Sequence, residues 1–261
     1  MGRKSLYELL ASAKKDDAKE FLLSLTNYIE KSGEERPPSA NITPSSLKCI
    51  RQIVYKLLST PVEEEKRSYN LKGITEVGTY RHETLQEYIT EMPTWEFVDV
   101  EEYVKEKGLD LRIGEKTDHE LHLYDDKNRI SYMCDGIIKN NDGKYFILEI
   151  KTMMSMKFVK IRNEVPDEYK LQATCYSYLM QIPDVMFLFE DRDLLTKKAM
   201  VFTPTQEEKN HIRDLIYRVN KFADENIIPE KPDVDRKVCQ YCRYKKRCNS
   251  DGIVQTTREN N

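Results

Sequence analysis

The sequence predicts an α/β fold in which a mixed central sheet is flanked by helices. Segments with helical periodicity come first, followed by three or four strand-like segments, a helix, two short strands and a long helix. The 261 residues suffice for one large core with an appended element. Because 39% of the residues are hydrophobic and 10% are aromatic, the composition excludes a disordered or low-complexity protein.

The N-terminal part reads as a helix and a linker. Apolar residues recur at spacings near three and four over residues 5–31, which predicts a helix. Residues 33–46 hold three prolines among small polar residues, so we expect an exposed linker there. We therefore divide the chain into an N-terminal helix with a Pro-rich linker, residues 1–46, and a larger domain, residues 47–261.

Two further helices are expected before the sheet. One covers residues 47–58, and the hydroxyl of Ser45 or Ser46 is placed to cap its first turn. The other covers about residues 76–91 and projects His82 from a face that also carries apolar residues.

The sheet itself is predicted from runs rich in β-branched and aromatic residues. Expected strands cover residues 95–104, 119–125, 129–139, 144–152, 185–190 and 198–204, and expected helices cover residues 167–181 and 206–226. Asn-Asn-Asp-Gly at residues 140–143 separates two of these strands and predicts a hairpin.

The charge distribution limits the choice of partners. The net charge is −3, so the whole chain gives no indication of a polyanionic partner. Basic residues gather locally, with six Lys or Arg and no acid in 236–248, and four with no acid in 151–162. The longest apolar runs are far shorter than the roughly 18 residues of a membrane span. The first residues also lack an apolar signal region, so we expect a cytoplasmic protein with no membrane partner.

A cluster of charged residues is expected on the predicted hairpin. Asp135 lies on one strand, and Glu149 and Lys151 lie two apart on the other, where i and i+2 share a face. Two carboxylates beside an ammonium group suit a hard divalent cation. Such an ion can polarise a phosphoryl oxygen and acidify a bound water, while the lysine orients the water or stabilises developing charge.

An alternative is that these residues form only a solvated cross-strand ion pair, which is common on half-exposed strands. Three features favour a catalytic site. The charges end a strongly apolar strand, Gln172 and Tyr176 share a face of the next helix, and His82 offers a nitrogen ligand.

The order of these motifs resembles that of RecB-like nucleases in the PD-(D/E)XK superfamily. The matching motifs are Gly78-x3-His82, Asp135-Gly136, Glu149-Ile150-Lys151 and Gln172-x3-Tyr176, within about residues 47–248. The resemblance implies that His82, Asp135, Glu149 and the main-chain carbonyl of Ile150 hold Mg²⁺ or Mn²⁺. It also implies that Lys151 assists the attacking water and that Gln172 and Tyr176 support the site or contact DNA. Asp135 lacks the preceding proline of the superfamily's name.

A second constellation consists of cysteines. Cys239, Cys242 and Cys248 offer three soft donors within ten residues, and a fourth ligand must come from elsewhere in the chain. Cys134 and Cys175 lie among apolar and aromatic residues, so we expect them in the core.

The cysteine pattern resembles the iron–sulfur subset of RecB-like nucleases, which includes the AddB type and the CRISPR-associated Cas-four type. This resemblance implies that Cys49, Cys239, Cys242 and Cys248 hold a 4Fe-4S cluster. The residues alone leave a structural zinc site of the same four thiolates as the alternative.

The resemblance as a whole implies a metal-dependent DNA nuclease, an exonuclease acting on single-stranded DNA or DNA ends. The rival hypothesis is a non-catalytic iron–sulfur subunit that binds DNA or assembles a DNA-processing complex, with the helix of residues 5–31 engaging a protein partner. In the basic tail, we expect Arg243, Lys245 and Lys246 to contact phosphates and Tyr244 to stack on a base.

Overall fold

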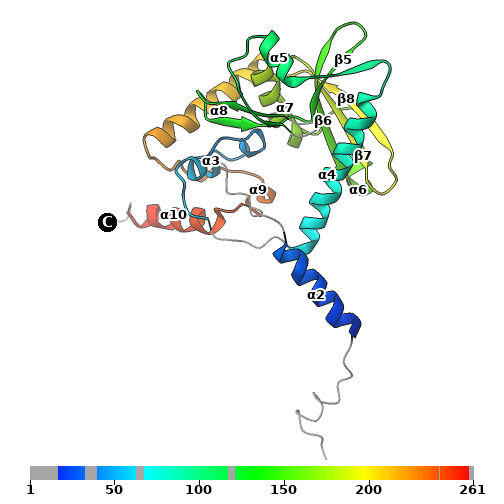
Figure 1. Ribbon diagram of the computed structural model, residues 1–261. Helices are drawn as coiled ribbons and strands as arrows, with labels where there is room; N and C mark the ends of the chain where they lie inside the picture. The colour runs from blue at the N-terminus through cyan, green and yellow to red at the C-terminus, as the bar shows by residue number, and fades with distance from the viewer. Residues whose placement is uncertain (1–16, 33–39, 63–67, 117–120, 241, 259–261) are drawn as a thin grey trace, which may run out of the picture. The chain divides into compact units, whose positions relative to one another are not determined.

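The computed structural model describes residues 17–32, 40–62, 68–116, 121–240 and 242–258 (Figure 1). The chain divides into two compact units, one of residues 1–37 and 65–77 and the other of residues 38–64 and 78–261. None of the described helices combines the length and the apolar character needed to cross a lipid bilayer.

The main sheet of the larger unit has five strands in the order β1-β5-β6-β7-β8. Their bounds are β1 Trp95–Val98, β5 Gly136–Asn140, β6 Tyr145–Met153, β7 Val185–Asp191 and β8 Lys197–Phe202. β6 and β7 run parallel and the other neighbours run antiparallel. The predicted mixed sheet is therefore confirmed.

The β5–β6 hairpin is also confirmed. Gly136 pairs with Leu148 at the open end, and Lys139 pairs with Tyr145 beside the turn. The Asn140 side chain accepts bonds from the main-chain N–H groups of Asp142 and Lys144 at 3.1 and 2.9 Å. Gly143 has a φ of +79°, a conformation that favours glycine, so the turn chemistry fixes the register of the strands.

A second sheet of three strands has the order β2-β3-β4. These strands are β2 Arg112–Lys116, β3 Leu121–Asp125 and β4 Ile130–Tyr132, and residues 119 and 120 of the strand predicted over 119–125 lie outside the described residues. The single predicted strand over 129–139 is wrong, because β4 and β5 belong to different sheets. The chain passes from one sheet to the other at Met133–Asp135, so Asp135 stands at the break between them.

The predicted strand over 95–104 is also wrong beyond Val98. The helix α5 covers Val100–Glu106, and the side chain of Asp99 accepts bonds from the main-chain N–H groups of Glu101 and Glu102. An aspartate at this position is a strong helix N-cap, and it outweighs the β preference of the valines that follow.

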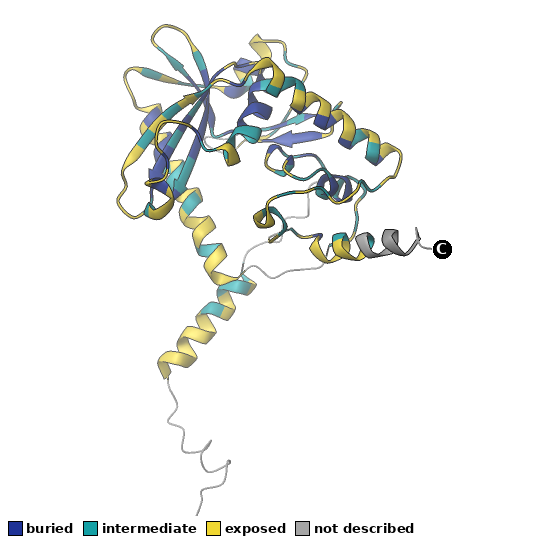
Figure 2. Cartoon of the chain, turned by 180° about the vertical axis from the view of Figure 1, so that it is seen from behind, coloured by how far each residue is buried: buried dark blue, intermediate teal, exposed yellow. Residues whose placement is uncertain are grey.

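Helices cover both faces of the main sheet. The described helices of this part of the chain are α3 Ile50–Leu57, α4 Tyr69–Thr90, α6 Ser155–Phe158, α7 Asp167–Met180, α8 Gln206–Asp224, α9 Arg236–Gln240 and α10 Lys245–Arg258, and α9 and α10 do not contribute to the cores on the sheet. On one face, Leu85 and Ile89 of α4 join an apolar cluster with Leu148 and Ile150. The other face joins a core that includes residues of α3, α7 and α8, and the central strands are mostly buried (Figure 2).

The helix predicted over 47–58 is shorter than expected. A 3₁₀ turn, η1, covers Pro44–Ser46, and α3 begins only at Ile50 with Cys49 as its N-cap residue. The predicted serine cap for this helix is therefore wrong. The hydroxyl of Ser46 instead donates to the carbonyl of Thr43 at 2.6 Å.

The smaller unit contains α2, Asp17–Lys31, and the first residues of α4. Residues 5–16 of the predicted N-terminal helix lie outside the described residues. No residue of α2 is buried. The ammonium group of Lys72 donates to the carbonyls of Ile29 and Glu30 at 2.8 and 2.9 Å, which satisfies free acceptors at the C-terminal end of α2.

Candidate active site

Asp135 is held where the hairpin meets the break between the sheets. Its carboxylate Oδ2 accepts the main-chain N–H of Ile150 at 2.5 Å. Because Gly136 pairs with Leu148, the ladder places Asp135 directly across from Glu149 on β6. The hairpin thus brings the two predicted carboxylates together.

Glu149 and Lys151 point to the same face of β6, and their side chains form an ion pair. Only 3% of the Glu149 side chain is exposed. Burial and the neighbouring charge of Asp135 raise the pKa of Glu149 to about 7. Burial alone would lower the pKa of Lys151, but the two carboxylates outweigh it and raise that pKa. The site therefore contains two acidic side chains and one lysine, so its charge would be balanced by a bound cation.

Helix α4 contributes to the same site. His82 Nδ1 lies 3.4 Å from Asp135 Oδ1, so the imidazole is beside the carboxylate it was predicted to join. One turn later, the buried side chain of Gln86 donates to the main-chain carbonyl of Asp135 at 2.6 Å. Gln86 was not among the predicted site residues, although its spacing of four from His82 placed both on one helix face.

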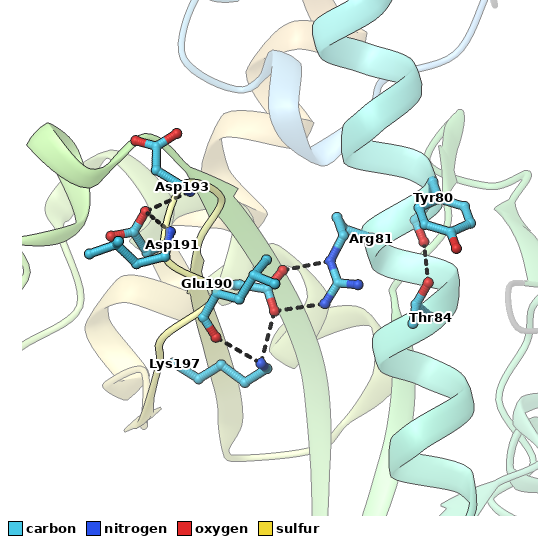
Figure 3. Close-up of polar contacts among 9 residues, drawn as sticks. Tyr80, Arg81, Thr84, Glu190, Asp191, Asp193 and Lys197 are labelled. Carbon is cyan, nitrogen blue, oxygen red and sulfur yellow. Dashed lines mark hydrogen bonds and ion pairs between the residues drawn. The ribbon is translucent and has the colours of Figure 1, made fainter.

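An ion-pair network that the sequence analysis missed fixes α4 against β7. Both oxygens of Glu190 accept bonds from the guanidinium of Arg81, at 2.8 and 2.9 Å, and Lys197 lies 3.0 Å from the same carboxylate (Figure 3). The Glu190 side chain is fully buried. Burial would raise its pKa, but the bonds from Arg81 and Lys197 outweigh burial and hold the pKa below its ordinary value. Because Arg81 precedes His82, this network also fixes the position of the imidazole.

Gln172 and Tyr176 support the site from α7. The Gln172 side-chain amide donates to the Tyr176 hydroxyl at 2.9 Å, and that hydroxyl donates to the carbonyl of Met133 at 2.9 Å. Burial, together with the charge of Glu149, raises the pKa of Tyr176 far above its ordinary value, so it remains a hydrogen-bond donor. The pair holds the segment that leads into Asp135.

The four predicted cysteine ligands come together although they are distant in sequence. Cys49, Cys239, Cys242 and Cys248 line one cavity of about 250 Å³. Burial raises the pKa of Cys49 and of Cys242, and the neighbouring cysteines raise them further. Cys134 and Cys175 are buried in the core, as predicted.

Neither the residues around Asp135 nor the four cysteines have the geometry of a complete metal site. Within the part of the chain that the structure describes, no three His, Cys, Asp or Glu side chains stand at the spacing of a complete metal site. The donor types nevertheless differ in the way the two predictions require. Oxygen and imidazole donors gather at the hairpin, whereas thiols gather at the cavity.

The basic tail is confirmed only in part as an accessible surface. Arg243, Lys245 and Lys246 are exposed. Tyr244 is only 6% exposed, and its ring stacks on Tyr55 with the centroids 5.4 Å apart. The predicted stacking of Tyr244 on a base is therefore wrong, because this ring is already used in packing α3 against the tail.

Comparisons with known proteins give one family match and several similar structures. A family model described as the PD-(D/E)XK nuclease superfamily matches residues 29–249. A search of curated protein sequences gives no significant match. Among solved structures, the crystal structure of SSO0001 is similar with 17% identity and a TM-score of 0.47, covering 90% of this chain and 98% of that one. An alkaline exonuclease from Laribacter hongkongensis, LHK-Exo in complex with dAMP, has 12% identity and a TM-score of 0.45, covering 72% and 90%.

Proposed function

The chain belongs to the PD-(D/E)XK nuclease superfamily, and from this premise we propose that it is a divalent-metal-dependent deoxyribonuclease. We propose that it acts as an exonuclease on single-stranded DNA or DNA ends and hydrolyses phosphodiesters with an activated water. The observation that carries the proposal is the convergence of Asp135, Glu149, Lys151 and His82 where β5, β6 and α4 meet.

The donor set fits Mg²⁺ or Mn²⁺. Two carboxylates and one imidazole offer hard oxygen and nitrogen ligands, and the main-chain carbonyl of Ile150 is proposed as a further ligand from the same strand. The pKa of Glu149, raised by burial and by Asp135, is the electrostatic sign of a site that lacks positive charge. A bound divalent cation supplies Lewis acidity and lowers the pKa of a coordinated water.

The chain's own residues position the reaction. The N–H of Ile150 fixes one oxygen of Asp135, and Gln86 fixes the adjacent main chain, so the carboxylate is preorganised. The ammonium group of Lys151, held by Glu149, stands where it can orient the attacking water and stabilise the charge that develops on the phosphoryl oxygens. Gln172 and Tyr176 act through the Met133 carbonyl and are proposed as positioning residues.

We further propose that the chain belongs to the RecB-like iron–sulfur subset. The shared cavity of Cys49, Cys239, Cys242 and Cys248 supports this, because soft thiolates in one place favour an iron–sulfur cluster or zinc over a hard cation. Its proposed role is structural, since it would join the start of the larger domain, residues 47–261, to its end. Metal analysis of anaerobically purified protein distinguishes the two: iron with sulfide supports the cluster, and stoichiometric zinc contradicts it.

DNA contacts outside the centre are proposed for Arg243, Lys245 and Lys246 of the tail, whose exposed charges can contact phosphates. A protein partner is proposed for α2, which exposes apolar side chains that include Phe21 and Tyr28. The rival function, a non-catalytic assembly subunit, would use the same helix.

The decisive experiment is digestion of end-labelled single strands with Mg²⁺, Mn²⁺ or EDTA. We expect metal-dependent cleavage of linear strands and no cleavage of a circular single strand, because an exonuclease needs an end. Cleavage of the circle would contradict the exonuclease mode. No cleavage of any DNA by metal-replete protein, with DNA binding retained, would favour the assembly subunit.

A further inference from the structure

Two neighbouring segments next to the candidate active site expose an unusual set of side chains. One is Met154–Arg162, which follows β6 and contains α6, and the other is Asp191–Lys197, which connects β7 to β8. We call them together the α6 platform, and Figure 1 shows α6 beside the ends of β7 and β8. Exposed apolar side chains of the platform are Met154, Met156, Val159, Leu194 and Leu195, with Met156 71% and Leu194 70% exposed.

The platform is rigidly built. The main-chain N–H of Ser155 donates to Asp193 Oδ2 at 3.0 Å, and the Ser155 hydroxyl donates to the carboxylate of Asp191 at 2.7 Å. At the other end, Lys198 donates to the carbonyls of Phe158 and Ile161 at 3.2 and 2.6 Å. The start of α6 is thus fixed by the β7–β8 connection and the segment from its end to Ile161 is fixed by β8, so the exposed apolar side chains are presented from an ordered surface.

The turn that presents the leucines is strained. Leu195 has a φ of +57°, a left-handed conformation that costs a residue with a branched side chain about 1 kcal/mol or more. The buried carboxylate of Asp191 maintains the turn by accepting the N–H of Asp193 at 2.9 Å (Figure 3). Buried hydrogen bonds therefore keep the side chains of Leu194 and Leu195 exposed to solvent. Neither side-chain packing nor the backbone preference of leucine explains this exposure.

The charge of the first platform segment, Met154–Arg162, is one-sided. Lys157, Lys160 and Arg162 are exposed, and residues 151–162 contain no acid. Across the described ranges, none of these three cations forms an ion pair with another side chain. A surface that combines cations with apolar side chains is complementary to a single strand of nucleic acid. The phosphates of such a strand can contact the cations, and its unstacked bases can contact Met or Leu side chains.

The platform also lies at the right distance from the chemistry. Met154, the N-cap residue of α6, follows the last residue of β6 and stands three residues after Lys151, and an extended chain advances about 3.3 Å per residue, so the two are on the order of 10 Å apart. That distance is spanned by one or two nucleotides of an extended strand.

We propose that the α6 platform binds the single strand of DNA next to the scissile phosphate. Lys157, Lys160 and Arg162 contact its backbone, and Met156 and Leu194 contact its bases. This inference rests on the proposed nuclease function and names the surface that holds its substrate.

Methionine oxidation by dilute peroxide, read by mass spectrometry, tests the proposal on the unaltered protein. Oxidation converts an exposed thioether to the sulfoxide and is slowed where a ligand covers it. In EDTA, a fluorescent dT20 strand is expected to slow oxidation of Met154 and Met156 at least threefold. Met92, 39% exposed and outside the platform, is the internal control and is expected to react at an unchanged rate.

A second arm measures how binding of dT20 depends on salt. Lys157→Ala/Lys160→Ala/Arg162→Ala is expected to reduce the slope of log affinity against log salt by about 2, since each phosphate contact on a single strand contributes about 0.7. The matched control, Arg213→Ala/Arg218→Ala/Lys221→Ala, removes the same charges from exposed positions of α8 and is expected to keep the slope. Met156→Ala/Leu194→Ala is expected to weaken binding about tenfold with the slope retained.

The outcomes separate this inference from the proposed function. If dT20 binds and is cut, but Met154 and Met156 are not protected and both triple variants behave alike, the platform is not the DNA surface. The platform would then be left to a protein partner. If the wild-type protein neither binds nor cuts any DNA, the proposed function fails and this inference fails with it.

Discussion

The charged cluster of His82, Asp135, Glu149 and Lys151 and the cysteine cavity are assembled in opposite ways. The cluster rests on a β-ladder and a long helix, and hydrogen bonds fix its parts, as between Asp135 and Ile150. The cavity rests on an N-cap residue, the five-residue helix α9 and the start of α10. Tyr55, which also lines the cavity, donates its hydroxyl to Asp251, 196 residues away.

The difference shows where order comes from in each region. Regular secondary structure already orders the charged cluster, so any divalent cation bound there would enter a preorganised site. In the cavity, the four cysteines are not bonded to one another, and any metal or cluster bound there would supply much of the order. We therefore expect losses of chemistry in the first region and losses of stability in the second.

The sharpest test of this contrast is Glu149→Gln, with Lys151→Ala as a second variant. Each is expected to lower the cleavage rate about 10³-fold, because it removes charge that stabilises the transition state. Circular dichroism and DNA binding are expected to stay near wild type. The control is Glu207→Gln on the exposed start of α8. A Glu149→Gln enzyme that cuts within threefold of wild type after chelation and Mg²⁺ return would show that the site is misassigned.

The cysteine cavity is tested by Cys49→Ser against Cys175→Ser. Cys49→Ser is expected to remove the bound iron and its broad visible absorbance and to lower the melting temperature by about 10 °C, since a cluster's binding energy becomes folding energy. Cys175→Ser changes a buried core thiol and is expected to keep the iron. The ligand assignment is overturned if the iron survives in Cys49→Ser and disappears in Cys175→Ser.

A smaller effect is expected where α4 meets β7. Glu190→Gln leaves the guanidinium of Arg81 without its carboxylate and is expected to cost about 2 kcal/mol of unfolding free energy at pH 7. The folded pKa of Glu190 is depressed, so its stabilisation is present above its unfolded value and is lost as the pH falls through the folded one. The unfolding free energies of the two proteins should therefore begin to converge as the pH falls below about 4.3, the ordinary glutamate pKa, and should meet only below the depressed folded pKa. A pH-independent difference would remove the ion pair as its cause.

The smallest effect is expected for Tyr55→Phe. The Tyr55 hydroxyl donates to Asp251 at 2.7 Å and accepts from Arg51 Nε at 3.0 Å, and loss of these bonds is expected to cost about 1 kcal/mol. The ring and its stacking on Tyr244 are retained. Tyr217→Phe, at an exposed position of α8, is the control. An equal change in the two proteins would show that the hydroxyl contributes nothing specific.

Local signals predicted the hairpin and the placement of its charges. The Asn-Asn-Asp-Gly turn set the register, and the period of two along β6 put Glu149 and Lys151 on one face. Both signals act within a few residues, so they survive in the folded protein. The roles of Asp135, Glu149 and Lys151 in catalysis stay predictions until the variants are measured.

Features that depend on distant partners could not be predicted. Arg81 and Glu190 pair across 109 positions, and Tyr244 is buried by Tyr55 from the opposite end of the domain. One miss was avoidable, because Asp99 followed by two glutamates is a helix start that the valine-rich context concealed.

The bond between Tyr55 and Asp251 has a consequence for how the chain is made. During synthesis, α3 leaves the ribosome long before the residues that cover it. The side chains of Arg51 and Tyr55 therefore stay exposed until nearly the whole domain has been translated. Contacts of such high sequence separation form late, because the intervening loop must first close. The β5–β6 hairpin and its charged cluster can therefore form before the contacts that close the cysteine cavity.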